Sequence, residues 1–184
     1  FDRAVSTSPK DGYVFAERGN QKKLMGDTTG ALGDFDLAIQ FDPNRALGYS
    51  RRGITRREQG DFSAALVDLN KALELEPKAW GNHAERGLIQ LNLGRIDEAK
   101  QGLEKAIALA PKYAPAYVNR ALLKRKLKDF KGALVDYNKA IELEPAAETY
   151  RARATVRKGT GDEAGAKTDF AKAAELEAAV AKKS

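Results

Sequence analysis

The sequence has no cysteine, and among its 184 residues it has only one histidine, His83. The absence of cysteine excludes disulfides, thiolate catalysis and cysteine-ligated zinc. A single histidine cannot build a histidine-rich metal site, and without cysteine no Cys–His nucleophile–base pair can form. We therefore expect no enzyme activity, no bound cofactor and no metal centre.

Long apolar runs are also missing. No segment approaches the roughly 18 consecutive apolar residues of a membrane span, and no signal peptide is visible. The chain opens with Phe1 instead of methionine. We therefore expect a soluble piece of a longer protein whose targeting segment is missing, and the compartment stays open.

Charged side chains and helix formers dominate what is present. Asp, Glu, Lys and Arg make up 32% of the residues, and the net charge is +6. Alanine, leucine, lysine, glutamate and arginine are abundant, which favours helices with much charged surface. The stretch SRRGITRREQG, residues 50–60, holds four arginines within seven positions. Such a cluster raises the possibility of a nucleic-acid partner.

The chain repeats itself every 34 residues. Five of the six prolines follow this spacing: Pro9, Pro43, Pro77, Pro111 and Pro145. A one-residue deletion follows the last of them. Each proline ends a helix, because it lacks an N–H and its ring clashes with the preceding turn. Gly-Asp dipeptides such as Gly26-Asp27 predict a left-handed helix end followed by an aspartate cap. Each period therefore predicts two helices.

The helical spacing of apolar residues is clear in NRALLKRKLKDFKGALVDYNKAIELEP, residues 119–145. This segment resembles the tetratricopeptide repeat family, whose pattern falls on Ala121, Ala133, Tyr137, Ala140 and Pro145. The resemblance covers essentially the whole chain. It implies an all-α fold, a right-handed superhelical solenoid of antiparallel helix pairs. It also implies a concave groove, lined by the first helices, that binds peptides or partner helices and performs no chemistry.

We expect one array over residues 1–184. Residues 1–11 form the end of a truncated preceding repeat, and residues 179–184 form a polar tail. Between them lie five repeats, at residues 12–45, 46–79, 80–113, 114–146 and 147–178.

One arginine series recurs in the first helices, and in four repeats an aspartate follows each arginine 16 residues later. The chain thereby resembles a subclass of the family with Arg-Gly in the first helix and Asp in the second. A guanidinium is well shaped for bidentate pairing with a carboxylate. We predict structural ion pairs between Arg18 and Asp34, Arg52 and Asp68, Arg120 and Asp136, and Arg153 and Asp169. In the third repeat Gly102 replaces the aspartate, so Arg86 must find another partner or face solvent. A second basic series that includes Arg56 could join the network.

The remaining basic residues of the first helices are expected to face the groove. Ile54, Leu88 and Leu122 occupy equivalent positions there. The predicted partner-binding surface consists of Arg51, Ile54, Arg57, Leu88, Leu91, Leu122, Arg125 and Lys126. An apolar patch flanked by cations suits a partner with a hydrophobic anchor and acidic flanks. Two alternatives stay open: a solvated face with scattered charge, and leucines that only pack between neighbouring first helices.

The sequence thus predicts a non-enzymatic scaffold for another protein or peptide, of acidic or mixed apolar and acidic character. A structural or self-assembling spacer within a longer protein is the alternative. A nucleic-acid reader built from helical repeats is disfavoured, because the aromatic residues sit at core positions and few remain to stack on bases. His83 replaces one of these aromatics, so we interpret it as a packing residue.

Overall fold

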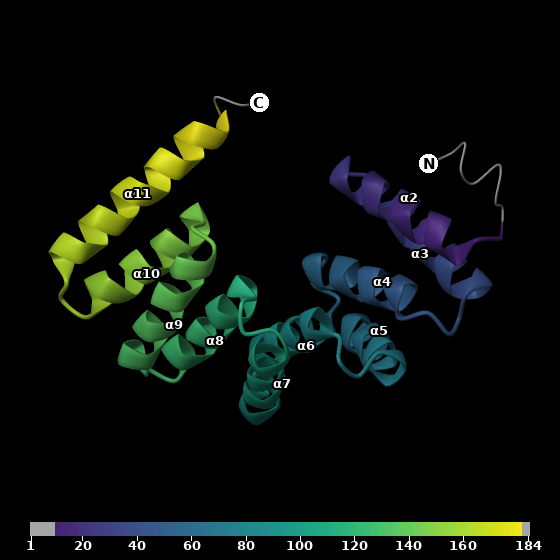
Figure 1. The fold of residues 1–184 in the computed structure, drawn as a ribbon, viewed down its shortest axis with the longest axis horizontal. Coiled ribbons are helices and arrows are strands. Elements are labelled where there is room, and N and C mark those ends of the chain that lie inside the picture. The colour runs from purple at the N-terminus through teal and green to yellow at the C-terminus, as the bar shows by residue number, and fades with distance from the viewer. Residues whose placement is uncertain (1–9, 182–184) are drawn as a thin grey trace. The chain divides into compact units, whose positions relative to one another are not determined.

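The computed structural model describes residues 10–181, and every regular element among them is an α-helix (Figure 1). The described helices alternate between the first and second members of five pairs. The first helices are α2 (Gly12–Leu24), α4 (Ala46–Glu58), α6 (Trp80–Asn92), α8 (Ala114–Lys126) and α10 (Ala147–Gly159). The second helices are α3 (Thr28–Phe41), α5 (Phe62–Leu75), α7 (Ile96–Leu109), α9 (Phe130–Leu143) and α11 (Glu163–Ala181).

The chain divides into two compact units, Phe1–Leu93 and Gly94–Ser184. Helices α2 to α6 belong to unit 1, and α7 to α11 belong to unit 2. The division falls inside the third predicted repeat, so a single array over the whole chain remains a prediction. The truncated repeat expected at the N-terminus lies largely outside the described residues. So does the end of the expected polar tail, of which residues 179–181 continue α11.

The turn follows the Gly-Asp signal in three of the five helix pairs, and in the third pair Gly94 is followed by Arg95, which makes no side-chain cap. Gly60 has a φ of 83°, in the left-handed region that glycine adopts without a steric cost. Asp61 then caps α5, where its side chain accepts a hydrogen bond from the Ala64 N–H at 3.1 Å. In the turn between α8 and α9 the glycine position is occupied by Lys128, with a φ of 62°. The cap therefore survives where the glycine is absent, since Asp129 accepts from the Gly132 N–H at 2.9 Å.

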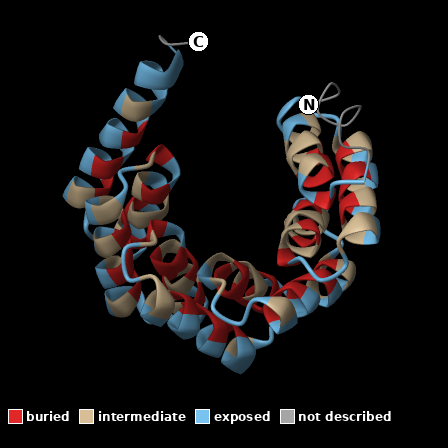
Figure 2. Ribbon diagram, turned by 45° about the vertical axis from the view of Figure 1, so that its right-hand side comes forward, coloured by how far each residue is buried: buried red, intermediate tan, exposed pale blue. Residues whose placement is uncertain are grey.

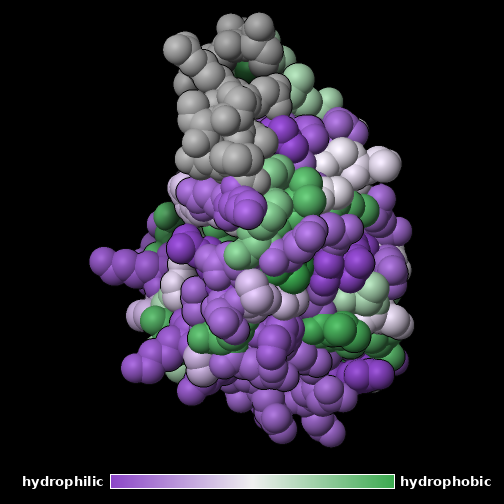
Figure 3. Space-filling view, turned by 90° about the vertical axis from the view of Figure 1, so that its right-hand side faces the viewer, coloured by the Kyte–Doolittle hydropathy of each residue, from purple (hydrophilic) through white to green (hydrophobic). Residues whose placement is uncertain are grey.

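Buried residues lie on the sides of the helices that face their neighbours, and exposed residues cover the outer sides (Figure 2). In unit 1, Ala65 and Leu69 of α5 form a cluster with Ile89 of α6. In unit 2, Tyr137 of α9 packs in the same way against Val156 of α10. Burial of apolar surface therefore joins each pair to the first helix of the next pair. The face drawn in Figure 3 is mainly hydrophilic, with small separate apolar areas.

Candidate partner-binding surface

Arg52 is held by a carboxylate and an aromatic ring of its own unit. Its Nη2 lies 2.6 Å from Oδ1 of Asp68, and its Nε donates to Oδ2 of the same carboxylate at 3.0 Å. The Asp68 side chain is only 1% exposed. The guanidinium carbon also lies 5.9 Å from the centre of the Tyr49 ring. A buried carboxylate and an aromatic ring therefore commit this arginine to the interior of the repeat.

The structure repeats this arrangement at the other predicted pairs. The shortest distances are 2.6 Å for Arg18–Asp34, 2.7 Å for Arg120–Asp136 and 2.5 Å for Arg153–Asp169. A second cation reaches each of the four aspartates, at 2.8 to 3.1 Å: Lys22, Arg56, Lys124 and Arg157. Two of the four arginines in SRRGITRREQG therefore contact Asp68. We call these eight cations, together with Arg86, the framework cations.

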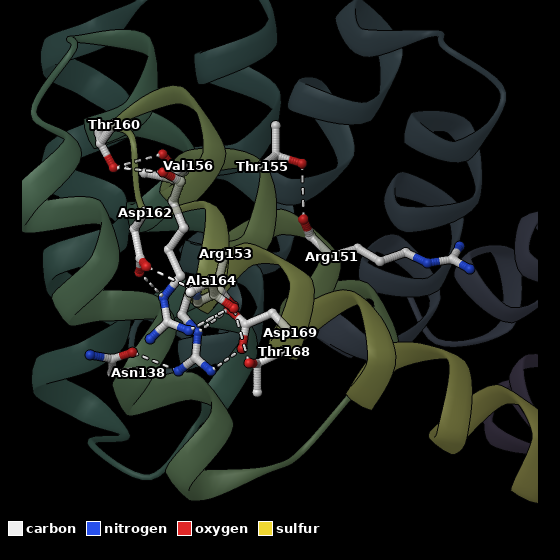
Figure 4. Close-up of polar contacts among 12 residues, drawn as sticks. Asn138, Arg151, Arg153, Thr155, Val156, Thr160, Asp162, Ala164, Thr168 and Asp169 are labelled. Carbon is white, nitrogen blue, oxygen red and sulfur yellow. Dashed lines mark hydrogen bonds and ion pairs between the residues drawn. The ribbon is translucent and has the colours of Figure 1, made fainter.

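Three of the framework arginines also contact the preceding second helix, an interaction that was not among the predicted ion pairs. Arg52 Nη1 lies 2.6 Å from Oδ1 of Asp36. Arg86 donates to Asn70 at 3.1 Å, and Arg153 donates to Asn138 at 2.7 Å (Figure 4). The signal is an acidic or amide residue 15 or 16 positions before each arginine. These contacts tie neighbouring helix pairs together within each unit.

His83 occupies the place of a tyrosine. Its Nε2 lies 2.9 Å from the Pro77 carbonyl oxygen, and the Tyr117 hydroxyl donates to the Pro111 carbonyl oxygen at 2.9 Å. A carbonyl oxygen can only accept, so Nε2 of His83 carries the proton. His83 is 9% exposed, so the structure gives it the packing position that its place in the repeat predicts.

The non-framework cations on the first helices of unit 1 contact neighbouring first helices. Arg57 Nε lies 2.7 Å from Oε2 of Glu85, a close ion pair that is not aligned as a hydrogen bond. Lys23 Nζ lies 2.8 Å from Oε2 of Glu58. Arg51 donates to the Asn20 side chain at 3.3 Å. The arginines that we predicted to face a partner are therefore engaged within the unit.

The apolar members of the predicted surface in unit 1 differ in exposure. Ile54 and Leu88 are half-buried. Leu91 is only 5% exposed, so it contributes packing and not accessible surface. Glu85 is also partly shielded, with a side chain 19% exposed. Burial raises the pKa of Glu85 above its ordinary value of 4.5, against the opposing effect of Arg57.

In unit 2 the corresponding residues are more open. Leu122 of α8 is half-buried, and Arg125 and Lys126 follow it on the same helix as exposed side chains. On α10, Arg151 pairs with Glu177 at 2.6 Å, but both side chains are largely exposed. Such a surface pair contributes little to stability. Figure 4 shows Arg151 pointing away from the cluster around Arg153 and Asp169.

The charge balance separates the two units once the framework cations are set aside. The first helices of unit 1 carry three other cations and three carboxylates, which are Lys23, Arg51, Arg57, Glu17, Glu58 and Glu85. The first helices α8 and α10 of unit 2 carry four cations and one carboxylate, which are Arg125, Lys126, Arg151, Lys158 and Glu148. The net charge of these residues is therefore zero in unit 1 and +3 in unit 2.

Among residues 10–181, no group of three or more His, Asp or Glu side chains is placed to hold a metal ion. None of the described helices is both long and apolar enough to cross a bilayer.

Comparison with known proteins points to one family. A sequence profile of the tetratricopeptide repeat matches residues 56–125, and a second profile of that repeat matches residues 114–146. No curated protein matches the chain by sequence.

Several solved structures share the fold. A crystal structure of MamA is 27% identical, with a TM-score of 0.70 over 89% of this chain and 96% of that chain. TTC0263, a thermophilic TPR protein of Thermus thermophilus, is 22% identical with a TM-score of 0.81, over 89% of this chain and 90% of that chain. YrrB, described as a TPR protein with an unusual peptide-binding site, is 18% identical with a TM-score of 0.66, over 100% and 98% of the two chains. The predicted all-α repeat fold is thereby confirmed.

Proposed function

The chain is a tetratricopeptide repeat protein, and we propose that it is a non-enzymatic scaffold that binds an acidic peptide or partner helix through α8 and α10. The observation that carries this proposal is the excess of exposed cations on these two first helices. In unit 1 the equivalent surface is electrically balanced and internally paired, so it offers less to an acidic partner.

The surface on α8 combines an apolar group with charge. Leu122 lies one turn before Arg125 and Lys126, and residues three and four apart share a helix face. Lys158 of α10 occupies the repeat position of Arg125, and Thr155 occupies that of Leu122. A partner could seat an apolar side chain on Leu122 and direct carboxylates toward Arg125 and Lys158. Contacts that lose water would dominate the affinity, while the cations would speed association and select acidic partners.

The first-helix tyrosines of this unit, Tyr117 and Tyr150, argue against a nucleic-acid partner on the α8 and α10 surface. Tyr117 and Tyr150 lie under the guanidinium groups of Arg120 and Arg153, at 5.6 and 5.4 Å from ring centre to guanidinium carbon. Tyr117 is also 9% exposed. These rings already serve as stacking partners inside the fold, so they are not available as platforms for bases.

The test is capture of partners with three matched baits. The first is the parent chain, and the second carries Arg125→Glu and Lys158→Glu. The third carries Lys131→Glu and Lys167→Glu, an equal charge change at exposed positions of second helices. Bound proteins are identified by mass spectrometry and quantified against the parent bait.

We expect the first and third baits to retain the same partners and the second bait to lose them by about ten-fold or more, which corresponds to about 1.4 kcal/mol. Circular dichroism and thermal melting check that the three baits are equally folded. Equal recovery by all three folded baits would place the binding surface elsewhere. Recovery of nothing by the parent bait would favour the spacer function.

A further inference from the structure

The junction between the first two helix pairs of unit 1 holds a guanidinium group. Arg45 immediately precedes α4, and its Nε lies 2.7 Å from Oδ2 of Asp42, which follows α3. The guanidinium carbon of Arg45 lies 5.9 Å from the centre of the Tyr13 ring on α2. An acidic residue at the end of a second helix and an aromatic ring on a first helix thus hold a cation between them.

The next junction of the same unit has the acidic residue but not the cation. Thirty-four residues further along, Glu76 takes the place of Asp42, and Ala79 takes the place of Arg45. The structure has a cavity of about 330 Å³ at this point. Its lining includes Leu47, Ser50, Glu76, Ala79, Trp80 and Asn82. Loss of a side chain as large as arginine therefore coincides with an open hollow at the equivalent position.

The cavity is electrostatically suited to a cation. Glu76 follows α5, so its carboxylate adds to the negative end of that helix. No ion pair joins Glu76 to another of the residues in the described range. Lys78 lines an adjoining hollow beside Glu76 and does not line this one. A ligand cation would consequently gain a carboxylate that no neighbouring lysine or arginine already uses.

The cavity is also lined by the aromatic ring of Trp80 and by the polar side chains of Ser50 and Asn82. Trp80 is 42% exposed and stands where the preceding pair has the small Ala46. Tryptophan is the best aromatic partner for a cation. Ser50 donates to the Asn82 side-chain oxygen at 2.6 Å, so the Ser50 hydroxyl proton is already used within the cavity lining.

We propose that this cavity binds the side chain of an arginine or lysine presented by a partner protein, with the guanidinium group preferred because Arg45 pairs with Asp42, the residue equivalent to Glu76, at the preceding junction. The cavity lies in unit 1 and has the opposite charge preference to the α8 and α10 surface. The proposal is therefore independent of the proposed function.

Trp80 makes the proposal directly measurable, because it is the only tryptophan of the chain. Its fluorescence and its indole N–H resonance report on this cavity and on the adjoining hollow, which Trp80 also lines. The probe is the peptide acetyl-Gly-Arg-Gly-amide, titrated into the full chain at low salt. The matched control is the same peptide with citrulline, which keeps the shape of arginine and removes its charge. We expect a saturable response in the millimolar range for the arginine peptide and at least about five-fold weaker binding for the citrulline peptide.

Two variants test the contacts. Glu76→Gln should weaken binding of the arginine peptide by about five-fold. Ala79→Arg should abolish the saturable Trp80 response, because it restores the residue that fills the preceding junction. Ser63→Arg adds the same charge on an exposed position of α5 and should leave binding unchanged. Thermal melting establishes that each variant is folded.

Three results would overturn the proposal. The parent chain could show no saturable response, the citrulline peptide could bind as well as the arginine peptide, or folded Ala79→Arg could respond like the parent.

Discussion

The two units share the same arrangement of framework cations and buried aspartates, but they differ in the charges of the remaining first-helix residues. In both units a buried aspartate binds an arginine and a second cation, as Asp68 does with Arg52 and Arg56. In unit 1 a non-framework arginine, Arg57, is paired with Glu85. In unit 2 the residue at the same repeat position, Arg125, is exposed. Repeat position therefore decides which cations are structural, whereas the neighbouring repeats decide which of the others can serve a partner.

The largest expected effect on the free energy of unfolding comes from removing a buried aspartate. It tests whether the two units depend equally on these aspartates. Asp68→Ala and Asp136→Ala should each lower the free energy of unfolding by about 3–5 kcal/mol, because each leaves two cations without their buried carboxylate. Asp36 contacts Arg52 from an exposed position, with a side chain 60% exposed. Asp36→Ala should therefore lower the free energy of unfolding by less than about 1 kcal/mol. Urea denaturation measures all three, and similar losses for Asp36→Ala and Asp68→Ala would contradict the framework assignment.

The next effect compares two arginines of one helix. Arg52→Ala should lower the free energy of unfolding by about 3 kcal/mol, since it strands the buried Asp68. Arg57→Ala should lower it by about 1 kcal/mol, because its partner Glu85 keeps some contact with water. Equal shifts in urea midpoint for the two variants would count against the division into framework and surface arginines.

A smaller effect on the free energy of unfolding is expected when the aromatic residues at one repeat position are exchanged between the two units. Phe35 and Tyr137 occupy equivalent positions, and both are fully buried. The Tyr137 hydroxyl has no hydrogen-bond partner among residues 10–181, and burial raises the pKa of Tyr137 above its ordinary value of 10.0. Tyr137→Phe should raise the free energy of unfolding by about 1 kcal/mol, and Phe35→Tyr should lower it by about 1–3 kcal/mol. A loss of stability in folded Tyr137→Phe would show that the hydroxyl has a partner.

The smallest expected effect is the pH dependence of unit 1, where two carboxyl groups act in opposite directions. Burial alone would raise the pKa of Asp34, but hydrogen bonds from Arg18 and Lys22 lower it below its ordinary 3.8. The ionised Asp34 carboxylate therefore stabilises the fold above pH 3.8. This stabilisation is lost as the pH falls through the pKa of Asp34 in the folded state. The pKa of Glu85 is raised, so acidification toward pH 4.5 relieves the cost of its buried charge.

Glu85→Gln should accordingly remove a gain in stability that accompanies acidification toward pH 4.5, and Asp34→Asn should remove a loss of stability as the pH falls below 3.8. Urea denaturation at a series of pH values from neutral to acidic measures both slopes. The same slope above pH 4.5 in Glu85→Gln and in the parent chain would contradict the raised pKa of Glu85.

Much of the fold could be predicted because the 34-residue period records it several times. The prolines, the Gly-Asp turns and the Arg52–Asp68 spacing all recur, so both ends of each structural contact appear in the sequence at a fixed offset. His83 could be placed for the same reason. A contact that is repeated in this way is visible even without a structure.

The candidate surface could be predicted only in part. Arg57–Glu85 and Arg51–Asn20 join positions in neighbouring repeats whose residue types change from one repeat to the next, so no periodic signal marks them. One sign was present: Glu17, Arg51 and Glu85 are equivalent positions of alternating charge. This alternation leaves the first helices of unit 1 without net charge once the framework cations are set aside, although the contacts themselves join Arg51 to Asn20 and Arg57 to Glu85. The exposure of Arg125, by contrast, depends on the packing of helices and became visible only in the structure.

The most direct measurement is the dissociation constant of a captured partner segment for two matched double variants, determined by isothermal titration calorimetry. Arg125→Gln with Lys158→Gln removes two cations from unit 2, and Lys23→Gln with Arg51→Gln removes two from unit 1. The unit 2 variant should bind about ten-fold or more weakly than the parent chain, and the unit 1 variant should stay within about three-fold of it. Equal weakening by the two folded variants, or a larger loss in the unit 1 variant, would contradict the assignment of the binding surface to α8 and α10.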